Sequence, residues 1–382
     1  MATSLRERAV DLVGLLTTPI LPADYVDLFA PLRAGAELRG RIVEVRPETR
    51  DAVTLVIRPG RAWAGHTAGQ YVRIGIDVDG VRQWRAYSVT SPADRADGCI
   101  AITVKAIPDG KVSTHIVRRA RAGMLVHLDQ ACGEFTLPVT RPAKTLFVTA
   151  GSGITPVLSI AASVLDVEPA SEVVLLYGNR TQRDVMFLEE LADLKDRWGA
   201  RLQVVHVLSR EEQGSELLSG RLDRERLQRL LSSLVPVDSV DEWYLCGPFG
   251  MVTEGREVLL EAGADPSRVH VELFHAEAPP PRVRTAGPVG GAATVTVVLH
   301  GRSSTLAVER DGDSVLDAVL AVRPDAPYAC KGGVCGTCRA RVVSGAVEMD
   351  VNYALEPDEL AAGVVLTCQS HPTTDEVRLE FL

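Results

Sequence analysis

The chain has 382 residues, of which 46% are hydrophobic and 24% charged, with a formal net charge of −9 at pH 7. This length exceeds what one hydrophobic core usually serves, and we expect three domains. An acidic chain without clustered lysines and arginines is not expected to bind nucleic acid. No apolar run approaches the roughly 20 residues that cross a bilayer, so we do not expect a protein integral to a membrane.

Residues 1–36 form an N-terminal extension without a recognisable motif. Its apolar stretch lacks a cleavage signal, which argues against a signal peptide. Residues 4–16 predict an amphipathic helix, which either packs on the protein itself or contacts a membrane or a membrane-bound partner. Three of the seven cysteines, Cys99, Cys132 and Cys246, have unpatterned spacing. Free thiols suit a reducing compartment, and we expect a cytoplasmic location, with peripheral membrane contact only through a partner.

Residues 37–140 read as an antiparallel β-barrel, because short β-rich segments alternate with turns. Strands are expected at 38–45, 52–57, 71–78, 99–104 and 124–128.

Residues 141–275 alternate strands with helices, which predicts an α/β domain with a parallel sheet. Strands are expected at 145–149, 172–177, 203–208 and 242–246, and helices at 156–164, 186–197 and 249–262.

Residues 276–293 have the proline- and glycine-rich composition of a linker. Residues 294–382 then predict a β-grasp (α+β) domain. Its first elements are a hairpin at 294–299 and 304–308 and a helix at 314–322.

The last domain carries four cysteines in the order C-x4-C-x2-C plus one distant cysteine, namely Cys330, Cys335, Cys338 and Cys368. This is the ligand spacing of a plant-type [2Fe–2S] ferredoxin. Interleaved glycines let the loop curl so that backbone N–H groups face the cluster sulfurs. The alternatives are scattered core cysteines or a structural zinc site, but zinc sites normally use two close pairs.

The α/β domain carries Gly151-Ser152-Gly153-Ile-Thr155-Pro156 between an apolar strand and an apolar helix. A glycine-rich turn there brings backbone amides and the positive helix end to a pyrophosphate. A purely structural turn is the alternative reading.

The residues that follow the next two strands bear on the choice of nucleotide. An NAD site often carries an acid after the second strand, but this chain has Asn179 and Arg180 there, and the next strand ends in Ser209 and Arg210. Arginines favour a 2′-phosphate, so we expect NADPH in preference to NADH unless both side chains are simply solvated.

The barrel contains Arg85-Ala-Tyr87-Ser88 directly after a predicted strand, and then a glycine-led turn from Gly110 through Val112 and Ser113 to Thr114. An arginine for a phosphate, a tyrosine face for a flat ring and a hydroxyl for a ring nitrogen suit a flavin. The first motif is common by itself, but it gains weight from the nucleotide-binding pattern that follows.

These motifs and Cys246-Gly247-Pro248 occur in the order seen in ferredoxin–NADP⁺ reductase-like flavoprotein reductases with a fused C-terminal ferredoxin domain. The chain most resembles the reductase components of phenylacetyl-CoA epoxidase, ketosteroid hydroxylase and acyl-CoA desaturase systems. The resemblance covers residues 37–382.

The resemblance implies that Arg85 holds the FAD pyrophosphate, Tyr87 packs on the isoalloxazine ring and Ser88 bonds near its N5. It implies that Cys246 lies close to the nicotinamide and that Phe274 covers the flavin, although a buried core thiol and ordinary packing are the alternatives. The other candidate cofactor-binding residues are Gly110, Val112, Ser113, Thr114, Gly151, Ser152, Gly153, Thr155, Pro156, Asn179, Arg180, Ser209, Arg210, Gly247 and Pro248.

The expected function is electron transfer from NAD(P)H through FAD and the [2Fe–2S] cluster to an oxygenase, desaturase or hydroxylase. Flavin is needed because a nicotinamide gives up two electrons together and a cluster accepts one. One alternative is a non-catalytic flavin/iron–sulfur subunit of a larger complex, which would not need the turn at 151–156. A zinc-stapled interaction protein is another.

Overall fold

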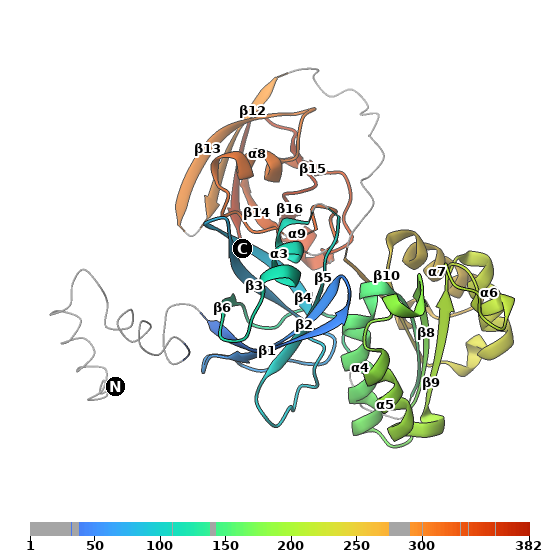
Figure 1. The fold of residues 1–382 in the computed structure, drawn as a ribbon. Coiled ribbons are helices and arrows are strands. Elements are labelled where there is room, and N and C mark those ends of the chain that lie inside the picture. The colour runs from blue at the N-terminus through green and yellow to red at the C-terminus, as the bar shows by residue number, and fades with distance from the viewer. Residues whose placement is uncertain are drawn as a thin grey trace, which may run out of the picture.

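The structure, a computed structural model, describes residues 32, 38–108, 110–137, 143–274, 291–299, 301–328, 330–334, 336–355 and 357–382. Three main sheets follow one another along the chain, each in a body of its own (Figure 1). The helix expected at 4–16 and most of the expected linker lie outside the described residues. In the described part, no helix is long and apolar enough to cross a membrane.

The first domain is a six-stranded antiparallel sheet in the order β4-β3-β6-β1-β2-β5. Val89, directly after β4, pairs with Ile102 of β5, so the edge strands meet and the sheet closes into the expected barrel. Its elements are β1 (Arg39–Thr49), β2 (Ala52–Pro59), β3 (Tyr71–Val78), β4 (Val81–Ser88), β5 (Ile100–Lys105), α3 (Lys111–Arg119) and β6 (Leu125–Leu128).

Strand β4 corrects one expectation, because Arg85 lies within a strand and not after one. Asp79 and Gly80 have φ angles of 51° and 79° and join β3 to β4 in a two-residue turn. Positive φ at both positions is the signature of a type I′ hairpin. The strand itself has polar residues on both faces, so it lacks the alternation that identifies a half-buried strand.

The second domain is a parallel sheet in the order β11-β10-β7-β8-β9, as expected. Two apolar cores, one with α4 and α5 and one with α6 and α7, cover it. Because these cores cover both faces of the sheet, its strands have continuous apolar sequences. The elements are β7 (Lys144–Ala150), 3₁₀ helix η1 (Gly151–Gly153), α4 (Ile154–Val167), β8 (Glu172–Asn179), α5 (Leu188–Trp198), β9 (Leu202–Leu208), α6 (Arg224–Leu234), β10 (Glu242–Gly247), α7 (Phe249–Glu261) and β11 (Val269–Leu273).

The third domain has a mixed sheet in the order β13-β12-β18-β14-β16, with α8 packed on it. The predicted hairpin and helix are present, and the domain has the expected α+β composition. The elements are β12 (Ala292–Leu299), β13 (Arg302–Glu309), α8 (Val315–Val322), β14 (Arg339–Ser344), β15 (Val347–Met349), α9 (Pro357–Ala361), β16 (Val364–Leu366), β17 (Ser370–Pro372) and β18 (Glu376–Phe381).

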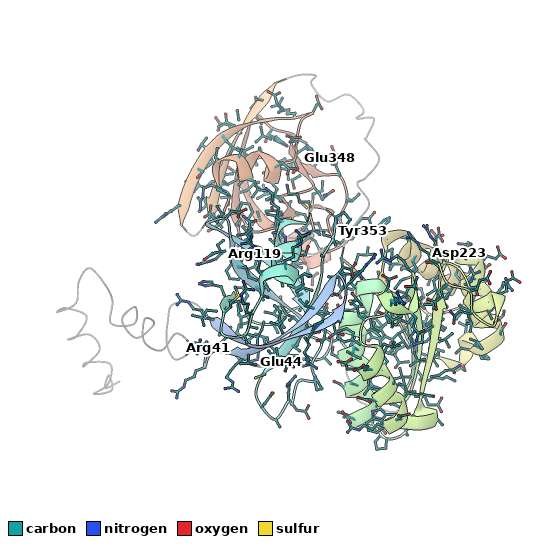
Figure 2. All side chains as sticks on the ribbon, viewed as in Figure 1. Arg41, Glu44, Arg119, Asp223, Glu348 and Tyr353 are labelled. Carbon is teal, nitrogen blue, oxygen red and sulfur yellow. The ribbon has the colours of Figure 1, made fainter. Side chains whose placement is uncertain are left out.

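Two of the contacts between domains join aromatic rings. Phe135 of the first domain is buried in a core of the second, with its ring 5.1 Å from that of Tyr244. The third domain has a core of its own. Tyr353 of the third domain lies where that domain approaches the second domain (Figure 2), and its ring is 5.7 Å from the ring of Phe249.

Candidate functional site

One cavity of about 1850 Å³ lies where the three domains meet. A pocket for one drug-sized ligand usually measures about 300–1,000 Å³, so this cavity has room for more than one such molecule. Candidate residues from all three domains line it, namely Arg85, Tyr87, Ser88, Gly110, Val112, Ser113, Ser152, Thr155, Phe274 and Cys330.

The start of helix α3 forms one polar wall of the cavity. Gly110 is its N-cap, and a Cβ there would lie 2.5 Å from both Ser113 Oγ and Ile107 Cγ1, so a larger residue would require these side chains to move. Lys111 and Ser113 also line the cavity. Unpaired N–H groups and the positive end of a helix favour an anion, and Lys111 adds a formal positive charge. This wall therefore fits a phosphate group.

Strand β4 supplies the adjacent wall. Arg85 and Tyr87 share one face of the strand because they are two residues apart, and both are half-buried. Burial raises the pKa of the Tyr87 phenol, so the ring stays neutral. Ser88 is buried and also borders the cavity. A cation, a flat neutral ring and a hydroxyl thus lie together at this wall.

The glycine-rich turn joins β7 to α4 through η1. Gly151 has a φ of 55°, which glycine adopts without strain. A Cβ on Gly153 would lie 2.0 Å from the carbonyl oxygen of Cys246, so no larger residue fits. The Tyr177 hydroxyl donates a hydrogen bond of 3.1 Å to the Gly151 carbonyl oxygen. The turn is therefore held against β8 and β10, and its Ser152 and Thr155 border the cavity.

Two buried polar atoms lie near this turn. Asn179 Nδ2 is buried without a hydrogen-bond partner among the described residues. Glu272, on β11, borders the cavity, and its Oε2 is likewise buried and unpartnered in that part of the chain. Because native structures rarely leave such atoms unpaired, the Glu272 carboxyl, which borders the cavity, fits a polar ligand.

Cys246 lies beside Glu272, since the two residues are register partners on β10 and β11. Burial raises the pKa of the Glu272 carboxyl to about 8 and that of the Cys246 thiol well above its ordinary value. Both groups are therefore mainly neutral at pH 7. Cys246 has no exposed surface and does not border the cavity.

The two arginines expected at a 2′-phosphate differ in their surroundings. An Nη atom of Arg180 lies 2.7 Å from Asp184 Oδ1 and 3.6 Å from Asp51 Oδ2 of the first domain. Arg210 is exposed and has no ion pair with the described residues. Its backbone N–H donates to the Arg180 carbonyl oxygen at 2.7 Å, so the two residues are neighbours.

Three of the four motif cysteines, Cys330, Cys338 and Cys368, belong to the described part of the third domain, and Cys335 lies outside the described residues. Cys338 and Cys368 share one buried core. Gln369 Nε2 lies 3.5 Å from Cys368 Sγ and donates at 2.8 Å to the carbonyl oxygen of Lys331, the residue after Cys330. The backbone N–H of Gly332 donates to Cys330 Sγ at 3.3 Å. Thiolates with N–H donors nearby fit an iron–sulfur cluster.

Some of the candidate residues do not border the cavity. These are Thr114, Gly151, Gly153, Pro156, Asn179, Arg180, Ser209, Arg210, Cys246, Gly247 and Pro248. Glu272 and Tyr328 are among the residues that border the cavity but are not predicted from the sequence. Glu272 is the acid in Val-His-Val-Glu-Leu, a five-residue alternating run that signals a strand only weakly.

Three family models match the chain in succession. The oxidoreductase FAD-binding domain matches residues 44–137, the oxidoreductase NAD-binding domain matches residues 147–257 and the 2Fe-2S iron-sulfur cluster binding domain matches residues 297–373. These matches confirm FAD, NAD(P)H and a [2Fe–2S] cluster as the cofactors.

Curated relatives match nearly the whole chain. A component of the 1,2-phenylacetyl-CoA epoxidase from Escherichia coli K12 is 40% identical over 89% of this chain and 96% of its own length. An NADPH oxidoreductase from Mycobacterium tuberculosis H37Rv is 39% identical over 87% of this chain and 82% of its own length.

Among solved structures, phthalate dioxygenase reductase shares the three-domain fold. Its TM-score is 0.59 at 22% identity, over 91% of this chain and 98% of that one. The chain therefore belongs to the ferredoxin–NADP⁺ reductase-like flavoprotein reductases with a fused [2Fe–2S] ferredoxin domain, and it is an NAD(P)H-dependent flavin/iron–sulfur oxidoreductase.

Proposed function

We propose that the protein oxidises NADPH and delivers the electrons singly to the terminal oxygenase, hydroxylase or desaturase of a multicomponent system. The observation that carries this proposal is the cavity, because the flavin, nucleotide and cluster domains all contribute to its walls. The relatives named as a component of an epoxidase and as ketosteroid monooxygenase reductase components support the class of acceptor. A cytoplasmic location and docking to a membrane-bound acceptor remain predictions.

When bound, FAD would supply the conversion between two-electron and one-electron transfer, and a [2Fe–2S] cluster would supply a one-electron carrier. The residues of the chain bind and orient. Arg85 and the start of α3 hold the FAD pyrophosphate, Tyr87 packs on the flavin ring and Ser88 donates a hydrogen bond near N5. A charge-assisted contact to a phosphate contributes about 1.5–3 kcal/mol.

On the nucleotide side, Ser152, Thr155 and the start of α4 hold the phosphates of NADPH. Glu272 keeps its proton at neutral pH because burial raises its pKa, and a neutral carboxyl suits the uncharged carboxamide of a nicotinamide. Phe274, which borders the cavity, shields the flavin from water. Cys246, the register partner of Glu272, lies behind this wall and close to the position proposed for the nicotinamide. Cys330, Cys335, Cys338 and Cys368 ligate the cluster.

Anaerobic titration of the purified protein with NADPH tests the proposal. We expect the flavin absorbance to bleach and an electron paramagnetic signal from the reduced cluster to appear. A protein that received electrons only from a partner enzyme would keep both cofactors oxidised in NADPH. Transfer to purified oxygenase components would then identify the acceptor.

A further inference from the structure

We propose that Tyr328 is a positioning residue that fixes the cluster-bearing domain against the flavin site through Arg85. The inference rests on the proposed function and deepens it. Tyr328 lies two residues before Cys330, and Arg85 lies two residues before Tyr87. The contact between them therefore joins the cluster loop directly to the flavin-binding strand.

Arg85 contacts Tyr328 through its whole guanidinium group. Its Cζ lies 4.6 Å from the centroid of the Tyr328 ring. Its Nη2 donates to the Tyr328 hydroxyl at 3.3 Å, and its Nη1 contacts the Tyr328 carbonyl oxygen at 3.5 Å. A cation over an aromatic face is attracted by the ring quadrupole, and more strongly where water is partly excluded.

Tyr328 is also held within its own domain. Lys331 Nζ lies 5.0 Å from the ring centroid, and it pairs with Asp317 Oδ1 of α8 at 2.6 Å. The Tyr328 ring therefore has two cationic neighbours, Arg85 from the first domain and Lys331 from the third. Because Lys331 ties the ring to α8, a shift of the third domain would pull the ring away from Arg85.

The same arginine can serve a phosphate and Tyr328 together. A guanidinium group has five N–H donors. Two contact Tyr328, and Nη1 also donates to the Trp84 carbonyl oxygen at 2.7 Å. The remaining donors can bind FAD. Electron transfer slows steeply with distance, so a residue that fixes the approach of the two domains sets the rate of transfer to the cluster.

Rapid-mixing kinetics with NADPH tests this role, with flavin and cluster signals followed separately. In Tyr328→Leu we expect flavin reduction at the wild-type rate and cluster reduction slowed about tenfold, because the cation–π and hydroxyl contacts are both lost. Tyr328→Phe keeps the ring, so its rate of cluster reduction should lie within about threefold of the wild-type rate. Tyr353→Leu, which removes the ring contact with Phe249 and leaves the Arg85–Tyr328 contact intact, is the matched control and should remain within about twofold.

Hydrogen exchange of the oxidised holoprotein without NADPH gives a readout independent of turnover. We expect faster exchange in Val81–Ser88 of Tyr328→Leu than of wild type, because the contact of Arg85 on this strand with the third domain is weakened. Unchanged cluster reduction and unchanged exchange in Tyr328→Leu would overturn the proposal. Equal slowing in Tyr353→Leu would also overturn it, because docking would then depend on the whole interface. If NADPH failed to reduce the wild-type flavin, the proposed function itself would be wrong.

Discussion

The two junctions between domains differ in kind. The flavin and nucleotide domains share an apolar core, in which Phe135 packs among residues of the second domain. The ferredoxin domain keeps a core of its own, and its contacts with the others include Tyr328, Tyr353 and Val334, which packs against a core of the second domain. Hydride transfer requires two rings at a fixed distance and angle. A single electron needs only close approach, so a lighter contact suffices.

Polar contacts strengthen the first junction further. A carboxylate oxygen of Glu48 on β1 accepts a hydrogen bond of 3.3 Å from the backbone N–H of Phe187, at the start of α5. The backbone N–H of Gly69 donates to Ser159 Oγ on α4 at 3.0 Å. These contacts hold the flavin barrel against two helices of the nucleotide domain. The comparison predicts that the cluster can be lost without harm to the other two domains.

The strongest test of this independence removes the cluster. In Cys338→Ser we expect no electron paramagnetic signal after reduction, because one ligand of the proposed set is gone. NADPH should still reduce the flavin at nearly the wild-type rate, since the first junction is intact. Cys99→Ser, which changes a buried free thiol of the barrel, is the control and should keep both properties. A wild-type cluster signal in Cys338→Ser would end the ligand assignment.

The second test opens the shared core. In Phe135→Ala we expect the free energy of unfolding to fall by about 3–5 kcal/mol, as for other buried phenylalanines. Calorimetry should show the flavin and nucleotide domains losing stability together, while the ferredoxin domain keeps its own transition. Tyr353→Ala, at the lighter junction, should cost less than about 1 kcal/mol because its side chain is half exposed. Equal losses of unfolding free energy in Phe135→Ala and Tyr353→Ala would mean that the two junctions do not differ in strength.

The sequence predicts the apolar strands and helices of the domains better than it predicts the contacts between the domains. Apolar strands such as β7 and β8 were predicted because burial on both faces gives continuous apolar runs. Strand β4 was missed because it faces a cofactor cavity and carries polar residues on both faces. Strand β11 was missed because five residues give too short a pattern. These two strands carry Arg85 and Glu272, which both border the cavity, so at both places the weak pattern coincides with the cavity.

Candidate site residues divide in the same way, into those that a local motif identifies and those whose role depends on distant contacts. The cysteine and glycine motifs are local, and their spacing is visible in the sequence. The partners of a long side chain depend on residues far along the chain. Arg180 meets Asp51, and Arg85 meets Tyr328 in another domain. No local pattern encodes such pairs, so the sequence predicts equal roles for Arg180 and Arg210 and says nothing of Tyr328.

Glu272 allows a pH test at the nucleotide side of the cavity. Its carboxyl has an ordinary pKa of 4.5, and burial raises this pKa to about 8 in the folded protein. Between these values the folded protein binds a proton that the unfolded chain releases. Stability therefore falls as the pH rises through this window. Each pKa unit corresponds to about 1.4 kcal/mol.

We expect Glu272→Gln, which stays neutral, to gain melting temperature relative to wild type as the pH is raised from 5 to 9. Thermal unfolding of the holoprotein at several pH values measures this difference. The exposed Glu212→Gln should run parallel to wild type. A constant difference between Glu272→Gln and wild type across this range would mean that Glu272 is ionised in the folded protein.

The smallest expected effect distinguishes the two arginines near the nucleotide. Arg180 already pairs with Asp184 and Asp51, whereas Arg210 is exposed without an ion pair in the described part of the chain. An exposed arginine–phosphate contact contributes about 1 kcal/mol, roughly a fivefold change in binding. We therefore expect Arg210→Ala to raise the KM for NADPH about fivefold and to leave the KM for NADH unchanged. In Arg180→Ala, loss of the ion pair with the first domain should affect the two nucleotides equally. Steady-state reduction of a one-electron acceptor with each nucleotide decides between them. If only Arg180→Ala raises the KM for NADPH, or if wild type uses NADH at least as well as NADPH, Arg210 does not bind the 2′-phosphate. An effect of Arg180→Ala on NADPH alone would also mean that the ion pairs of Arg180 do not fix the junction between the first two domains.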